Sequence, residues 1–362
     1  MKLKKKILVI AVLLIFCLII HLYSNDENRV ENGYSLGLFV HFSRFLRTIF
    51  GKIPFSIGDI LYGLLFIWLI WSLVKFIKKA FKRQPGISKK GLYLNTLYRV
   101  FLFCSCAYII FNLFWGINYD RKGIASQLGL EMKKYDPADL EKINELLVDK
   151  INYYKAAHIT KNSGYPTNSG LYAGVTDAYK NIAVEYPFLK YQPESLKSSL
   201  WSWLGNYTGF TGYYNPFTGE AQLNIETPKF LEPFIACHEV GHQLGYAKEM
   251  EANFVGYLAA SNSSDPLFQY SVYLEMFTYA NRNLFVTDST AAKDFRKKLS
   301  EPVVADIKEW IKFSREHESF VEPIVSWVYG KYLQGNKQPK GVRSYDEVTT
   351  FLIAYYKKFG SI

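Results

Sequence analysis

Residues 238–253 read HEVGHQLGYAKEMEAN, and this stretch decides what the rest of the chain is built around. His238 and His242 are four residues apart, so on a helix they share one face and can approach the same metal ion. Glu239 stands beside them, where a bound water would lie. A third histidine three residues after Gly245 would complete a common zinc pattern. That position holds Lys248, whose ammonium group cannot be a ligand.

The third ligand is therefore expected from the next helix, which opens with acids. Positions 249, 253, 256 and 260 are Glu, Asn, Gly and Ala, a stripe of small residues that can pack closely on the motif helix. Glu249 lies on this stripe and is the predicted third ligand, with Glu251, on another side, as the alternative. Asn253 is predicted to bond to a ligand histidine. The alternative for Glu249 is a carboxylate near a helix N-terminus that is favourable with the helix dipole and has no other role.

Three protein ligands and one open position are what a catalytic zinc requires. A carboxylate then takes a proton as activated water attacks a carbonyl, so Glu239 is the predicted general base. A bare HExxH also occurs by chance on helices with a solvated face. Here the preceding LEPFIAC favours a buried helix, where these polar groups need partners. Gly245 follows at a helix end and allows the chain to reverse.

Three apolar runs precede this region, at residues 7–23, 57–74 and 100–117. Each is close to the lower limit of roughly 17–25 residues for a membrane-spanning helix. The first run lacks a small-x-small cleavage site in HLYSNDEN and is predicted to be an uncleaved anchor rather than a signal peptide. We therefore expect a membrane domain at 1–118 and an outer domain at 119–362.

The formal net charge of +11 is concentrated beside these runs. Residues 1–118 hold 16 Lys and Arg against 4 Asp and Glu, whereas the remainder holds 27 against 28. This distribution indicates topology signals and argues against nucleic-acid binding. By the positive-inside rule the N-terminal tail and the loop at 75–99 are cytoplasmic. The outer domain is then expected on the extracytoplasmic side of a multi-pass membrane protein.

The four cysteines offer no disulfide for the outer domain. Cys17, Cys104 and Cys106 lie in the apolar runs, and Cys237 precedes the motif as a packing residue. The outer domain must therefore be stable through its core. Its fold class is predicted as α+β and mostly helical, with one small sheet. The sequence predicts a helix starting at Asp136, helices at 171–186, 249–260, 265–284, 291–316, 321–333 and 345–358, at most a short helical turn at 195–204, and a strand at 220–225.

The strand at 220–225 lies just before the motif helix. An edge strand beside a metal site can pair with a substrate backbone, although an ordinary half-buried strand explains the alternation equally well. The predicted substrate contacts are Glu220, Ala221, Gln222, Leu223 and Asn224. The group that stabilises developing negative charge stays open, because the chain has 28 tyrosines. Its candidates are Tyr213, Tyr214, Tyr270, Tyr273, Tyr345 and His317.

The Glu249-x-x-x-Asn253 spacing resembles the Glu-x-x-x-Asp of the gluzincin metallopeptidases, which include thermolysin and the BlaR-type sensors. The resemblance implies zinc bound by His238, His242 and Glu249. Asn253 departs from the family's Asp, and Glu249 follows the second histidine sooner than in those families.

A closer resemblance covers nearly the whole chain and rests on four separated motifs: WGINYDR at 115–121, GYYNPFTGEAQLN at 212–224, HEVGHQLGYAKEMEANFVGYLA at 238–259 and RSYDEVTTFLIAYY at 343–356. In this order they resemble the bacterial membrane-protein family of domain of unknown function 3810. That resemblance implies N-terminal spans followed by a zincin-like HExxH domain, and it implies no substrate.

The expected function is a zinc metallopeptidase that hydrolyses peptide bonds outside the cytoplasm, with the lipid bilayer and a peptide or protein substrate as partners. Two alternatives remain open. One is a zinc-binding membrane sensor or scaffold without turnover. The other is a zinc amidase that acts on wall or lipid amides, because water activation is the same for both kinds of hydrolase.

Overall fold

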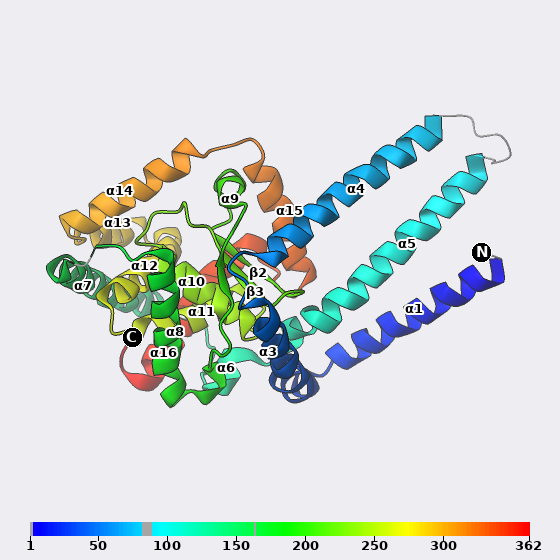
Figure 1. Cartoon of the computed structure of the whole chain (residues 1–362). Helices are drawn as coiled ribbons and strands as arrows, with labels where there is room; N and C mark the ends of the chain where they lie inside the picture. Colours follow the sequence, from blue (N-terminus) through cyan, green and yellow to red (C-terminus); the bar gives the residue numbers. More distant parts are fainter. Residues whose placement is uncertain (1–2, 82–88, 163) are drawn as a thin grey trace.

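The structure is a computed structural model that describes residues 3–81, 89–162 and 164–362. Three long helices project from one side of a mostly helical body (Figure 1). Within the described ranges the body contains one small sheet of three strands. The predicted α+β class with mostly helical content and a small sheet is confirmed at this level.

The elements follow one another without large insertions. They are α1 Leu3–Ser24, α2 Glu27–Arg29, η1 Val30–Leu38, α3 Phe39–Phe50, α4 Ile57–Phe81, α5 Lys89–Phe114, η2 Gly116–Asp120, α6 Gly123–Gln127, α7 Pro137–Lys161, α8 Asn168–Glu185, η3 Pro187–Leu189, β1 Leu196–Ser198, α9 Ser202–Thr208, β2 Gly212–Asn215, β3 Glu220–Leu223, α10 Glu232–Gln243, α11 Glu249–Ser261, α12 Pro266–Thr287, α13 Ser289–Lys297, α14 Glu301–Glu316, α15 Glu322–Gly335, η4 Gly341–Glu347 and α16 Val348–Phe359.

The projecting helices α1, α4 and α5 are long and apolar enough to cross a membrane, over Lys4–Ser24, Ile57–Lys78 and Tyr93–Phe114. The three predicted apolar runs are thus confirmed as helices. The third ends earlier than predicted, because the chain turns at Trp115 into η2. The basic loop predicted on the cytoplasmic side includes residues 82–88, which lie outside the described residues.

The segment between α1 and α4 folds onto the body, a feature that the sequence did not reveal. Its side chains form a small second core with residues that follow α5. The fully buried members are Ile20, Val30, Tyr34, Phe39, Trp115, Ile117, Tyr119 and Ala247. The predicted domain boundary at residue 118 therefore passes through shared packing.

The main core lies among α7, α8, α10, α11, α12 and α16. The predicted helix start at Asp136 is confirmed, since Asp136 and Asp139 each accept a hydrogen bond from the other's backbone N–H. The single helix predicted at 291–316 is wrong. It is broken at residues 298–300, where α13 ends and Pro302 opens α14 in its first turn.

The sheet has the order β1-β3-β2, with β3 parallel to β1 and antiparallel to β2. The helical turn predicted at 195–204 is wrong in its first half, because Leu196–Ser198 forms β1 and a helix begins only at Ser202. This strand is three residues long and exists through its pairing with β3, so no local pattern announces it. β2 is left as an edge strand.

Candidate metal centre

The motif helix α10 is buried at every position. Pro233 stands in its first turn, where a missing N–H leaves nothing unsatisfied. After Gln243 the chain reverses at Gly245, whose φ of +92° favours glycine. This confirms the predicted helix end. Cys237 is a free and fully buried thiol, which confirms its packing role.

Two side chains from α3 hold the C-terminal end of α10. Ser43 Oγ and Arg47 Nη1 donate to the carbonyl oxygen of Gln243 at 3.1 and 2.9 Å. The last carbonyls of a helix have no partner within it and carry its negative dipole end, so a cation there is favourable. The segment between the first two apolar helices thus positions the motif helix.

Helices α10 and α11 pack at very short range because glycine stands on both sides of the contact. A Cβ on Gly256 would lie 3.0 Å from the backbone nitrogen of His238, and one on Gly241 would lie 3.2 Å from the carbonyl oxygen of Ala252. The predicted contact through the small stripe at 249, 253, 256 and 260 is confirmed for Gly256. This approach brings Glu249, at the start of α11, into reach of both histidines.

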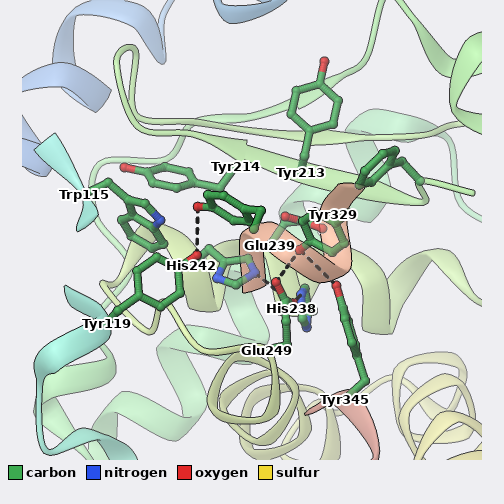
Figure 2. Close-up of a pocket in the computed structure, with 13 residues that line it drawn as sticks. Trp115, Tyr119, Tyr213, Tyr214, His238, Glu239, His242, Glu249, Tyr329 and Tyr345 are labelled. Atoms are coloured by element: carbon green, nitrogen blue, oxygen red, sulfur yellow. Dashed lines mark hydrogen bonds and ion pairs between the residues drawn. The ribbon is translucent and has the colours of Figure 1, made fainter. Parts of the chain in front are cut away.

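The carboxylate of Glu249 lies between the two imidazoles (Figure 2). Its Oε2 atom is 3.3 Å from Nε2 of His238 and 3.4 Å from Nε2 of His242. Three donors at about 2.0–2.1 Å from a tetrahedral zinc ion would be about 3.3–3.4 Å from one another. The two distances from Glu249 therefore match a tetrahedral ligand set.

The remaining ring nitrogens of the histidines are also engaged. Nδ1 of His238 lies 2.7 Å from Oδ1 of Asn253, and Nδ1 of His242 lies 2.7 Å from the carbonyl oxygen of Tyr246. Both partners are acceptors, so each Nδ1 carries the proton and each Nε2 lone pair faces Glu249. The predicted contact of Asn253 with a motif histidine is present.

The charges of the cluster formed by His238, His242 and Glu249 favour the binding of a cation. Burial opposes ionisation of Glu249, yet the two histidines beside it hold its pKa well below the usual value. Burial likewise lowers the pKa of His242, but the carboxylate of Glu249 outweighs burial and raises it. Oε2 of Glu249 has no hydrogen-bond donor in the described residues. A buried anion between two imidazoles with a free lone pair fits a divalent metal.

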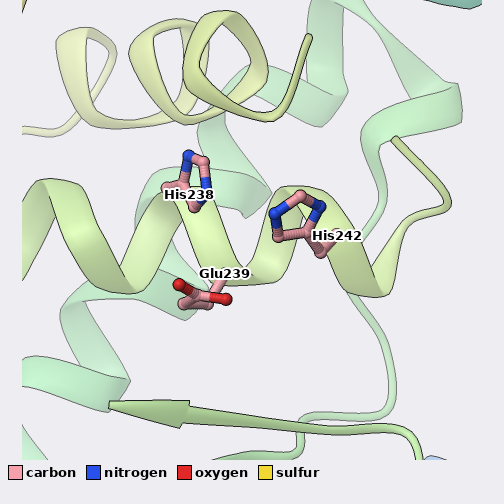
Figure 3. A group of neighbouring side chains, drawn as sticks. All are labelled: His238, Glu239 and His242. Carbon is pink, nitrogen blue, oxygen red and sulfur yellow. The ribbon is translucent and has the colours of Figure 1, made fainter. Parts of the chain in front are cut away.

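Glu239 projects from α10 next to the two imidazoles, and it lines the same cavity (Figure 3). A looser grouping of Glu239 with His238 and His242 keeps the three ligand atoms within 4.8 Å of one another. Glu249 is the better third ligand, because one of its oxygens is close to both nitrogens at once. Burial raises the pKa of Glu239 to about 7, and its Oε2 has no hydrogen-bond partner among the described atoms.

Glu251, the alternative ligand, belongs to a different cluster. It packs against Gly123 and lies 3.9 Å from Lys248 Nζ. The nearby Arg121 forms a buried two-point ion pair with Glu31, at 3.0 and 2.7 Å, and its Nη1 donates to the carbonyl oxygen of Gly245 at 3.1 Å. The structure therefore brings Glu249, and not Glu251, to the histidines.

A family described as protein of unknown function, DUF3810, matches residues 34–353. The chain belongs to this family. The match runs from η1 to α16, so it includes the α3 segment that caps the motif helix as well as α4 and α5.

No curated protein and no solved structure matches this DUF3810 member. Any function must therefore be argued from the site itself.

The substrate strand predicted at 220–225 is not an edge. β3 is the central strand, paired on both sides, so its backbone cannot accept another strand. Its side chains are occupied as well: Glu220 accepts hydrogen bonds from the backbone N–H groups of Ile57 and Gly58 at the start of α4, at 3.2 and 2.6 Å. The predicted contacts Glu220, Ala221, Gln222, Leu223 and Asn224 are all buried.

The free edge beside the motif belongs to β2. A Cβ on Gly212 would lie 2.6 Å from Oε1 of Glu239, so only glycine lets this strand lie so close to that carboxylate. Gly212 and the next two residues also line the cavity at the site. The exposed strand edge next to the motif is therefore that of β2, the strand before β3, and not that of β3.

Two connected hollows meet at the motif. A cavity of about 140 Å³ lies over the histidines, and a larger cleft of about 360 Å³ continues outward past α12, α14 and α15. The residues that line both are Phe210, Gly212, His238, Glu239, Tyr329 and Tyr345.

The candidates for stabilising negative charge fall into two groups, those that line the cavity and those that do not. Tyr213, Tyr214 and Tyr345 line the cavity. The hydroxyls of Tyr270 and Tyr273 instead donate to Asp306 and to the carbonyl oxygen of Ile362, at 2.6 and 3.3 Å, while His317 packs on Tyr207 and Phe313. None of these last three residues lines either hollow as described.

Tyr329 is a site residue that the sequence did not single out. Its hydroxyl donates to Oε1 of Glu249 at 2.6 Å and lies 3.4 Å from the hydroxyl of Tyr345 (Figure 2). Trp115 and Tyr119, directly after α5, also line the cavity. No spacing signal could have found them among so many aromatic residues.

Proposed function

We propose that this DUF3810 protein is a membrane-anchored zinc metallopeptidase with its active site outside the cytoplasm. The observation that supports this best is the single oxygen of Glu249 at 3.3 and 3.4 Å from two imidazole nitrogens. His238, His242 and Glu249 would hold the ion. Their other atoms are fixed by Asn253, by the carbonyl of Tyr246 and by a tyrosine hydroxyl.

When bound, zinc supplies a Lewis acid that activates water and polarises a carbonyl group. Glu239 accepts the proton that the attacking water loses and returns it to the leaving amine nitrogen. Its buried, unpartnered oxygen and its raised pKa suit a group that must hold a proton briefly. Substrate backbone pairs with the free edge of β2, next to Glu239.

The hydroxyl of Tyr345 is the group best suited to stabilise the negative charge on the carbonyl oxygen. It lies in the cavity, and its neighbour Tyr329 already donates to Glu249. Preorganised donors of this kind stabilise a transition state because they need not reorient during the reaction.

The test uses the full-length protein in lipid nanodiscs. We expect about one zinc ion per chain by elemental analysis and cleavage of peptides from a mixed library by mass spectrometry. Glu239→Gln should keep the zinc and lose about 10²–10⁴-fold in turnover, the usual contribution of a general base.

The control is Glu141→Gln, which changes an exposed carboxylate on α7 and should leave turnover unchanged. Full activity in Glu239→Gln would rule out the mechanism. If instead wall or lipid amides are the only compounds cleaved, the protein is an amidase with the same site.

Two hydrogen bonds between α4 and the region of the site favour a sensor as the second candidate. The carboxylate of Asp59, in the first turn of α4, accepts hydrogen bonds from the backbone N–H of Leu200 at 2.6 Å and from the hydroxyl of Tyr213. A ligand in the cavity could thus act on α4 directly. A biological response that survives Glu239→Gln would support this reading.

A further inference from the structure

An apolar surface follows the outer sides of α9 and α15. On α9 and the residue pair before it, the exposed apolar side chains are Leu200, Trp201, Trp203, Leu204 and Tyr207. On α15 and the residues before it they are Phe320, Ile324, Trp327, Val328 and Tyr332. Trp203 is 54% exposed and Trp327 is 65% exposed. A soluble surface rarely gathers so many large apolar groups unless another phase or partner covers them.

The two helices are joined to each other. Ser319 Oγ, just before α15, donates to the carbonyl oxygen of Tyr207 on α9 at 2.6 Å. The inner side of α15 faces the cleft, since Val325, Ser326 and Tyr329 line it. Helix α15 therefore has a cleft face and, opposite to it, an apolar face with Ile324, Trp327 and Val328, while Tyr332 lies at the boundary and also lines the cavity. We call the exposed apolar residues of α9 and α15 the rim surface.

Direct contacts fix the level of the rim surface relative to the apolar helices. The indole of Trp201 donates to the backbone carbonyl of Asp59 at 3.3 Å and packs against Gly63 of α4. Gly63 lies six residues into α4, about 9 Å along its axis. At the other end, the ring of Tyr332 lies 6.1 Å from that of Phe111, in the last turn of α5.

A bilayer has a hydrocarbon core of about 30 Å and polar layers that bring it to about 40–45 Å. The helical α4 has 25 residues, which is about 37 Å, so its first turns lie in the polar layer when the rest crosses the core. Trp201 contacts the first turns of α4, and Tyr332 contacts the last turn of α5, so both side chains lie at this level. Tryptophan and tyrosine are the residues enriched at this level of a membrane.

We propose that the rim surface lies in the headgroup layer of the membrane and that the cleft takes its substrate, a polypeptide segment held close to that surface, from this layer. The membrane is the fitting occupant because the rim surface continues directly into α4 and α5, whose spanning windows are 0% and 11% buried in protein. Figure 1 shows α15 beside the domain end of α4, with α7 and α13 on the far side of the body. Only the substrate half of the proposal rests on the proposed peptidase function.

The placement is tested by spin labels on the full chain in nanodiscs of phosphatidylcholine and phosphatidylglycerol. Cys17, Cys104 and Cys106 are changed to serine, and buried Cys237 is kept. Labels at Trp203→Cys and Trp327→Cys should be relaxed by oxygen and protected from a water-soluble nickel complex. Labels at Tyr153→Cys and Val286→Cys, exposed on α7 and at the end of α12, should show the reverse.

Equal accessibility at all four positions would overturn the placement. Protection of positions 203 and 327 from both reagents would also overturn it, because protein rather than lipid would then cover the rim surface. Neither measurement needs enzyme activity, so a failure of the peptidase proposal is seen separately.

The substrate half is tested with one peptide sequence, either free in solution or anchored in the nanodisc by an apolar helix through a short or a long spacer. The short spacer should give about tenfold faster cleavage than the free peptide, because anchoring raises the effective concentration at the cleft. In Trp203→Lys/Trp327→Lys this ratio should fall toward one, whereas Tyr153→Lys/Val286→Lys should keep it. Equal cleavage of free and anchored peptide by the unaltered protein would overturn the substrate class even with the labels in lipid.

Discussion

Glu249 is the residue on which the candidate centre depends most. One of its oxygens faces both motif histidines, and the other accepts a hydrogen bond from Tyr329. Both oxygens are thus directed by residues from other elements. Helical periodicity already placed Glu249, and not Glu251, on the stripe of small residues, and the close packing of α11 on α10 brings that stripe to the histidines.

We predict that Glu249→Ala loses zinc while Glu251→Ala retains it. The first change removes one of three ligands, whereas the second removes an acid that lies beside Lys248 and Gly123. Elemental analysis of the full-length protein measures this directly. Zinc lost only from the Glu251 variant would mean that the wrong acid has been assigned.

Glu275 gives a prediction about pH. Burial raises its pKa to about 7, and it lines the cleft at 7% exposure. An acid with a higher pKa in the folded state binds more protons there, so its contribution to stability falls as pH rises from about 4.5 toward 7 and above. Glu275→Gln should therefore raise the free energy of unfolding at pH 8. This increase should exceed the effect of the same change at pH 4.5 by about 1–3 kcal/mol.

The measurement is denaturant unfolding in detergent at both pH values. Exposed Glu141 on α7 supplies the matched change to Gln, which should show no such difference. An effect of Glu275→Gln that is independent of pH would contradict the prediction.

At the scale of elements, the contact between α10 and α11 was the part most open to prediction. The stripe at 249, 253, 256 and 260 follows from helical periodicity alone, because both helices are regular and adjacent in sequence. The pairing of β1 with β3 and the cap from α3 were not visible. Each depends on a partner far along the chain, and neither leaves a periodic trace in its own short segment.

We predict that Gly256→Ala weakens zinc binding and destabilises the fold. The added Cβ would meet backbone atoms of His238 at 3.0 and 3.1 Å, which cannot rotate away. Overpacking of this kind costs about 1–3 kcal/mol and would push α11, with Glu249, away from the histidines. Zinc affinity by competition with a chelating dye and the unfolding midpoint are the two measurements.

Gly335→Ala on α15 is the matched control, because a Cβ there meets no atom within 4 Å in the described structure. If both alanine variants bind zinc equally well, close packing of the two helices does not set the ligand geometry.

For the whole molecule, the sequence correctly indicated three apolar helices, a mostly helical body and the motif helix. It did not indicate that residues 27–50 would belong to the body. Arg47, Ser43 and Glu31 look like ordinary loop residues, yet all three are buried against elements that follow α5. Burial of this kind depends on the complete tertiary fold.

We predict that Arg121→Met destabilises the protein by about 3–5 kcal/mol, because it leaves the carboxylate of Glu31 buried without its partner. The double variant Glu31→Gln/Arg121→Met should recover most of this loss, since no unpaired charge remains. Thermal unfolding in detergent compares the three proteins. Equal destabilisation by the single and the double change would show that the ion pair is not the cause.

The hydrogen bond from Ser43 to Gln243 joins residues 200 positions apart. This separation sets the time that passes between the synthesis of the two partners. At about 5–20 residues per second, the ribosome needs roughly 10–40 s to reach the second partner after the first. During that interval α3 is already synthesised, whereas α10, the helix whose C-terminal end it caps, is not. Tyr345 is synthesised later than either partner, so the cavity of a nascent chain is incomplete until that residue has been added. The proposed peptidase would therefore stay inactive until the segment that carries Tyr345 has been synthesised.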